Sequence, residues 1–169
     1  MAALSYLAFA AFPIGMVLAA VSDLFTMTIP NRISVLLAIA FVVLAPVAGM
    51  DFQELLMHGA AGGIVLAIGF ALFAFGWIGG GDAKLAAIAA LWLGGQHALE
   101  FVGISAVFGG ALTLLVLSFR RAPLPAMIMR QPWVARLHEE GHGVPYGIAL
   151  AAGAMLIYPQ TPWMQLIAG

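Results

Sequence analysis

Residues 69–95 read GFALFAFGWIGGGDAKLAAIAALWLGG: an apolar segment runs into three consecutive glycines, and Asp82 then precedes a second apolar segment. The first segment covers 59–78 and is long enough to cross about 30 Å of hydrocarbon. The second covers only 83–93, which at about 1.5 Å per residue is about half of that distance. Whether this short segment crosses a membrane decides how many times the chain does so.

The composition of the chain predicts a membrane protein. Of 169 residues, 64% are hydrophobic and 8% are charged, and the mean hydropathy is +1.09. Soluble domains carry about 25% charged residues, so this chain has too little polar surface to cover a globule in water. We therefore expect a lipid bilayer as its main partner. The net charge of −1 gives no reason to expect nucleic acid, and a chain without cysteine has neither disulfides nor thiolate metal sites.

The apolar segments predict an all-α polytopic membrane protein of about six helices, in a single domain over residues 1–169. No alternating strand pattern is present. The expected membrane helices are 4–22, 33–48, 59–78, 83–93, 98–119 and 144–156. No Lys or Arg precedes the first of them, so it is expected to be a retained helix and not a secretory signal.

The positions of the basic residues favour six membrane helices. If segment 83–93 crosses, loops 23–32, 79–84 and 119–143 share one side. All basic residues then lie on that side: Arg32, Lys84, Arg120, Arg121, Arg130 and Arg136. If the segment does not cross, this asymmetry disappears. The positive-inside rule thus predicts that both termini are outside and that Asp82 faces the cytoplasm.

Two carboxylates lie at the cytoplasmic ends of predicted helices, Asp23 and Asp82. An ionisable group at membrane depth costs about 2.5–3.5 kcal/mol and usually faces a cavity or a partner. Asp82 alone could be a helix N-cap, but Gly79, Gly80 and Gly81 before it allow positive φ and close backbone approach, as in an irregular backbone that lines a cavity or is buried in protein. Asp23 follows the first apolar segment, near a helix C-terminus, where the helix dipole disfavours its charge. The alternative interpretation is that Asp23 is a solvated interfacial residue without a functional role.

A pair of carboxyl groups that share one proton can hydrolyse a peptide bond. If their oxygens come within about 3 Å, both cannot readily ionise at once. The ionised group takes a proton from the attacking water, and the protonated group donates to the peptide carbonyl. Because the two groups titrate as a pair, acid and base are not assigned individually.

Three motifs in this order resemble type IV prepilin peptidases, which are intramembrane aspartic endopeptidases with a G-x-G-D motif. They are Asp23 followed by Pro30 and Asn31, then GGGDAKL at 79–85, then VPYG at 144–147. The resemblance implies an active site built from Asp23, Asp82, Gly79, Gly80, Gly81 and Lys84, with Pro30, Asn31, Pro145 and Tyr146 beside it. It also implies removal of the basic leader from prepilins or pseudopilins at the cytoplasmic face of the inner membrane, with neither cofactor nor metal.

The chain departs from the long members of this family in one respect. Those members carry an N-terminal domain with paired cysteine motifs and also N-methylate their product. A chain without cysteine resembles the short form associated with Flp/Tad pili, so we expect peptidase activity alone. The sequence does not fix the oligomeric state. Two alternatives stay open: a transporter or channel subunit that uses Asp23 and Asp82 as a proton or ion relay, and a non-catalytic scaffold.

Four further interpretations concern residues near these motifs. Lys84 is either an interfacial lysine or a charge that acts on the aspartate pair or on the substrate. Tyr146 is predicted to hydrogen-bond a catalytic aspartate. Asn31 or Thr28 is predicted to cap the second helix. Segment 138–142, HEEGH, is expected to be a solvated loop and not a metal site.

Overall fold

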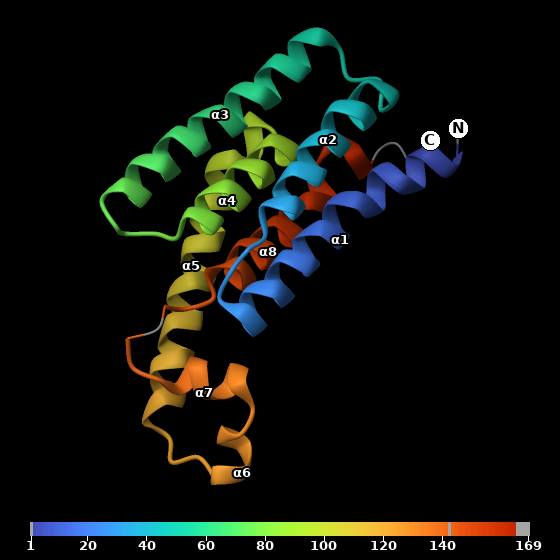
Figure 1. Cartoon of the computed structure of the whole chain (residues 1–169). Helices are drawn as coiled ribbons and strands as arrows, with labels where there is room; N and C mark the ends of the chain where they lie inside the picture. The colour runs from blue at the N-terminus through green and yellow to red at the C-terminus, as the bar shows by residue number, and fades with distance from the viewer. Residues whose placement is uncertain (1, 142, 165–169) are drawn as a thin grey trace.

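A computed structural model describes residues 2–141 and 143–164, with side chains from Phe9 onward, and these residues form a bundle of helices (Figure 1). The main helices are α1 (Ala2–Thr26), α2 (Asn31–Val47), α3 (Phe52–Ala74), α4 (Gly80–Leu93), α5 (Gly95–Arg121) and α8 (Tyr146–Ile157). Two short helices, α6 (Ala126–Met129) and α7 (Pro132–His138), and a 3-10 turn, η1 (Tyr158–Gln160), complete the described part. The all-helical fold class is as predicted.

Three of these helices are long and apolar enough to cross a bilayer. The qualifying stretches are Phe9–Thr26 in α1, Phe52–Ala74 and Gly95–Arg121, and α2 is a shorter apolar helix. Large apolar side chains such as Val42, Ile64 and Leu115 point outward and are exposed. An apolar outer surface of this extent suits lipid rather than water, and the chain is therefore a membrane protein.

The short helix α4 lies inside the bundle, where it packs against α2, α3 and α8. Leu85 and Trp92 on α4 are fully buried. The indole N–H of Trp92 donates to the carbonyl of Leu37 at 3.0 Å, and that of Trp163 donates to the carbonyl of Trp92 at 2.8 Å. A buried indole needs such a partner, so these bonds fix α4 between α2 and the C-terminal segment. Helix α4 has 14 residues, and the surrounding helices cover much of it.

Two glycines on α3 set the distance to α4. A Cβ atom on Gly62 would lie 3.0 Å from the Cβ of Leu91, and one on Gly69 would lie 3.0 Å from the Cβ of Ala83. Larger residues would force the two helices apart. This close contact brings the start of α4, with Asp82, up against the end of α3.

Helix α3 begins at Phe52, seven positions before the start predicted from hydropathy. The reason is a capping box: the N–H of Glu54 donates to Asp51 at 2.8 Å, and the N–H of Asp51 donates to Glu54 at 3.0 Å. Such a cap stabilises a polar first turn that hydropathy alone does not reveal.

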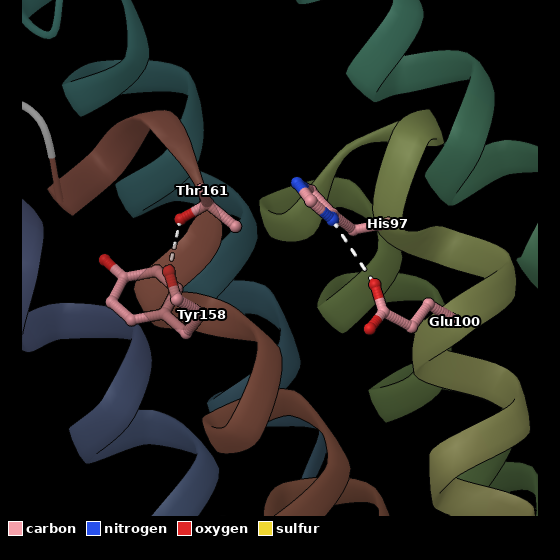
Figure 2. Close-up of polar contacts among 4 residues, drawn as sticks. All are labelled: His97, Glu100, Tyr158 and Thr161. Carbon is pink, nitrogen blue, oxygen red and sulfur yellow. Dashed lines mark hydrogen bonds and ion pairs between the residues drawn. The ribbon is translucent and has the colours of Figure 1, made fainter.

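The connections of the bundle fall into two groups (Figure 1). The α1–α2 and α3–α4 connections and the segment after α5 lie toward one end, with the start of α8. The six basic residues are on these segments or beside them, so the loops group as the charge argument required. At the opposite end, His97 contacts Glu100 at 3.7 Å and Thr161 donates to the carbonyl of Tyr158 at 2.6 Å (Figure 2).

The polar segment after α5 is more ordered than the predicted loop. Arg120 donates to the carbonyls of Leu137 and Gly143 at 2.9 and 3.0 Å, and Arg136 donates to the carbonyl of Phe25 at 3.1 Å. His138 is half-buried, its ring packed edge-on against Phe119. The prediction of a solvated loop is therefore wrong for His138, although Glu139 and Glu140 are exposed. His142 lies outside the described residues.

Candidate active site

Asp23 is a buried carboxylate near the end of α1, with only 6% of its surface exposed. Its Oδ2 accepts a hydrogen bond of 2.7 Å from the backbone N–H of Gly147, the second residue of α8. The N-terminus of a helix carries partial positive charge and free N–H groups. The structure therefore places Asp23 at the favourable end of α8, which offsets its unfavourable position at the end of α1.

The contact between Asp23 and Gly147 requires a glycine. A Cβ atom at position 147 would lie 2.9 Å from Oδ2 of Asp23, 3.0 Å from its Cβ and 3.1 Å from Cδ1 of Ile29. Pro145, which is buried, is the N-cap residue of α8 and starts the helix in this position. The VPYG motif thus delivers a backbone N–H to Asp23, which sequence reasoning did not find.

Asp82 is the third residue of α4, and the N-cap of that helix is Gly79. The alternative interpretation of Asp82 as the N-cap is therefore wrong, because Gly79 occupies that position. Its carboxylate lies close to the backbone of Gly79, inside the first turn of α4. A Cβ atom on Gly79 would lie 2.8 Å from Oδ2 of Asp82.

The glycines before Asp82 serve close approach and not positive φ. Gly79 has φ −73°, which any residue adopts, and in this connection only Gly76 has a positive φ, of 74°. A Cβ atom on Gly80 would lie 3.3 Å from the ring of Phe73, and one on Gly81 would lie 3.2 Å from the Cβ of Ile29. Of the two expectations for this run, close backbone approach is confirmed and positive φ is wrong, and Gly79 lines a cavity.

Asp23 and Asp82 line the same cavity of about 630 Å³. They are close enough for direct electrostatic interaction. The remaining wall comes from α1, the α3–α4 connection, α4 and the start of α8: Met27, Gly76, Trp77, Ile78, Gly79, Ala86, Gly143, Val144, Tyr146 and Leu150. Two acidic residues from distant parts of the chain therefore meet in a cavity large enough for water and a peptide backbone.

Lys84 joins two of the sequence motifs. Its Nζ donates a hydrogen bond of 2.9 Å to Oδ1 of Asn31, the first residue of α2. The N-cap of α2 is Pro30, and no side chain makes a capping bond there. The prediction that Asn31 or Thr28 caps this helix is therefore wrong. The lysine is exposed and its hydrogen-bond partner is the amide oxygen of Asn31, so its effect on the aspartates stays a prediction.

Tyr146 faces the cavity but bonds elsewhere. Its hydroxyl lies 3.1 Å from Oγ1 of Thr113. Its ring packs so closely against Gly109 that a Cβ atom at that position would lie 2.5 Å from Cε1 of Tyr146. The predicted hydrogen bond from Tyr146 to an aspartate is therefore wrong, because α5 supplies the partner. Neither Thr113 nor Gly109 belongs to a motif that sequence reasoning singled out.

The described residues contain no group of three or more His, Cys, Asp or Glu side chains placed to hold a metal ion. What the cavity does contain is a buried carboxyl group, Asp23, held by a backbone N–H, and a half-buried one, Asp82. Such a pair can activate water and protonate a leaving group by general acid–base chemistry.

Comparison with known proteins identifies the family. The type IV leader peptidase family matches residues 10–114, which include both aspartates, Pro30, Asn31 and Lys84 but not the VPYG motif. No curated protein and no solved structure matches the chain. The family match covers more than half of the 169 residues. The chain therefore belongs to the type IV leader peptidase family and is an aspartic prepilin peptidase.

Proposed function

We propose that Asp23 and Asp82 are the catalytic pair, which removes the basic leader from Flp-like prepilins or pseudopilins. The observation that supports this proposal is that two acids from α1 and α4 line one cavity, at the end of the bundle where the basic residues gather. Such a placement of two carboxyl groups inside a membrane protein needs a functional reason, because burial of charge is costly.

The chemistry follows from the arrangement of the pair. One carboxylate takes a proton from a water molecule, whose oxygen attacks the peptide carbonyl carbon. The other, protonated, carboxyl group donates its proton to the carbonyl oxygen, and a neutral tetrahedral intermediate forms. As this collapses, the C–N bond breaks and the leaving nitrogen takes a proton from the first group, while the second recovers its own.

The backbone has a positioning role in this mechanism. The N–H of Gly147 fixes one oxygen of Asp23. Asp23 then keeps its other oxygen for water or substrate. Fixed groups of this kind need little reorganisation during the reaction, which lowers the barrier.

We further propose that the chain forms one domain with six membrane helices, α1 to α5 and α8, in the inner membrane. The basic end, and with it the cavity, faces the cytoplasm under the positive-inside rule. Both termini are then outside, although residues 1 and 165–169 lie beyond the described part. The absence of cysteine supports peptidase activity without N-methylation and favours the short, Flp/Tad type.

Co-expression with a Flp-type prepilin tests this function. Asp23→Asn and Asp82→Asn should each abolish leader removal, measured as the mass of the recovered pilin, at unchanged enzyme abundance. Asp51→Asn is the matched control, because Asp51 caps α3 at the opposite end and asparagine is also a good cap. Continued cleavage by either active-site variant would contradict the proposal. Ion flux in proteoliposomes without any cleavage would favour the relay instead.

A further inference from the structure

A second cavity, of about 600 Å³, opens between α3 and α5. Its sides are formed by Ala61, Ile68 and Leu72 on α3 and by Ala98, Val102 and Ala106 on α5. Its floor is formed by α4 and α8. We call this cavity the α3–α5 groove. It is lined almost entirely by apolar side chains, and it faces the surroundings of the bundle, where several of its lining residues are exposed.

The α3–α5 groove adjoins the active-site cavity. Ile78, Ala86, Tyr146 and Leu150 line both spaces. The ring of Tyr146 is held against Gly109, and its hydroxyl pairs with Thr113. This residue therefore forms a fixed partition where the apolar groove meets the cavity that contains the two aspartates.

The groove extends from the aspartates toward the opposite end of the bundle. On α3 it runs from Leu72 back to Ala61, and on α5 from Ala106 back to Ala98. At about 1.5 Å per residue, the α3 side is about 16 Å long, which is about three turns of a helix. A groove in this direction can hold a helix whose N-terminal end reaches the aspartates.

Small residues line the groove where α3 meets α4. Gly69, Ala83 and Ala86 lie there, with Gly69 and Ala83 in close contact. Inside a bilayer there is no hydrophobic gain from helix association, so helices associate where small residues permit close packing. Larger aliphatic side chains, among them Ile68 and Val102, form the sides. This is the pattern expected of a surface that takes up a membrane helix.

We propose that the α3–α5 groove binds the apolar helix of the prepilin that directly follows the cleavage site. This inference rests on the proposed function. The substrate helix enters sideways from the bilayer and packs on α4 and α8 between α3 and α5. Its first residues pass Tyr146 into the active-site cavity, and its leader lies at the basic end. The length of the groove makes the first three turns of the substrate helix the specificity-determining segment.

Cysteine cross-linking tests this proposal directly, because the chain has no cysteine of its own. Ile68→Cys places a thiol in the groove, and Leu36→Cys is the matched control on α2. Their side chains are 56% and 64% exposed, and each lies within two turns of the same end of the bundle. Both variants carry Asp82→Asn so that the substrate stays intact. The partner is a Flp-type prepilin with one cysteine in the second turn of its apolar helix.

We expect several-fold more cross-linked product with Ile68→Cys than with Leu36→Cys. Equal yields would mean random encounters in the bilayer with a lipid-filled groove, and no product at either site would place the substrate elsewhere. Either result overturns the proposal. Cleavage of the same prepilin by the chain without substitutions is measured in parallel. If this cleavage occurs and cross-linking fails, only the groove is wrong. If it does not occur, the proposed function has failed and the inference falls with it.

Filling the groove gives an independent test. Ala106 lines the groove, whereas its neighbour Val107 is 72% exposed and does not. Ala106→Trp should raise KM for the full-length prepilin on the order of tenfold, because the indole ring would occupy space that the substrate helix needs. Val107→Trp should leave KM unchanged. Equal KM values for both variants at equal abundance would contradict the proposed binding of the substrate helix.

Discussion

The carboxylate of Asp23 accepts the backbone N–H of Gly147 at 2.7 Å, between residues 124 positions apart in the sequence. One of the two acids in the cavity is therefore positioned by the N-terminus of α8. The hydrogen bond ties α1 to α8, and it explains why a carboxylate at the end of α1 is tolerated in a buried place.

Gly147→Ala should lower cleavage by at least about tenfold, since the new Cβ atom would lie 2.9 Å from the oxygen of Asp23 and a displacement of about 1 Å at a catalytic group can cost 100-fold. The measurement is the rate of prepilin cleavage by purified enzyme. The control is Gly110→Ala, because nothing lies within 4 Å of a Cβ at that position. Equal rates for both variants would show that the position of Asp23 tolerates this change.

Lys84→Met and Asn31→Ala should lower cleavage by similar factors, because each removes the same hydrogen bond of 2.9 Å between α4 and α2. A hydrogen bond to a charged group contributes about 1.5–3 kcal/mol at most, and less when exposed as here. In a double-mutant cycle, the combined variant should lose little more than either single variant. Fully additive losses would mean that Lys84 acts separately from Asn31, for instance on the substrate. The test also records the pH dependence of cleavage, which should stay unchanged in Asn31→Ala.

Trp163→Phe should lower the free energy of unfolding by about 1–3 kcal/mol, because it leaves the buried carbonyl of Trp92 without its donor and removes buried volume. Thermal unfolding in detergent measures this loss. Trp77→Phe is the control, since its side chain is 75% exposed and should barely affect the melting temperature. If both variants melted alike, the aromatic cluster around Trp92 would not be what holds α4 in place.

Ser105→Ala should leave stability unchanged or raise it by about 1 kcal/mol, because its buried hydroxyl has no hydrogen-bond partner among the described residues. The hydroxyl also packs against Gly153, where no Cβ atom fits. Gly153→Ala should therefore destabilise the contact between α5 and α8, and less so when combined with Ser105→Ala. Melting temperatures of the two single variants and the double variant measure this. A loss of stability in Ser105→Ala alone would show that the hydroxyl does have a partner.

The helices could be predicted from the sequence because each depends on a local pattern. Apolar runs, the glycines at 79–81 and the prolines after α1 and before α8 set the main helices to within a few residues. The exceptions were the start of α3, where a capping box added a polar turn, and the short helices α6 and α7, which lie in a segment predicted to be a loop. The order of the motifs likewise pointed to Asp23 and Asp82 and to the family that comparison then showed. The grouping of the basic residues was predictable because the membrane acts on each loop separately.

Contacts between distant segments could not be predicted in this way. The partner of Tyr146 is Thr113 and not an aspartate, Lys84 bonds Asn31, and Asp23 is held by Gly147. Each of these depends on how helices remote in sequence pack together, and no local pattern encodes that packing. The sequence by itself determined a helical membrane chain with two acids in recognisable motifs. Only the tertiary structure decided which backbone group holds Asp23 and that an apolar groove adjoins the cavity of the two acids, because both arise from the spaces between helices.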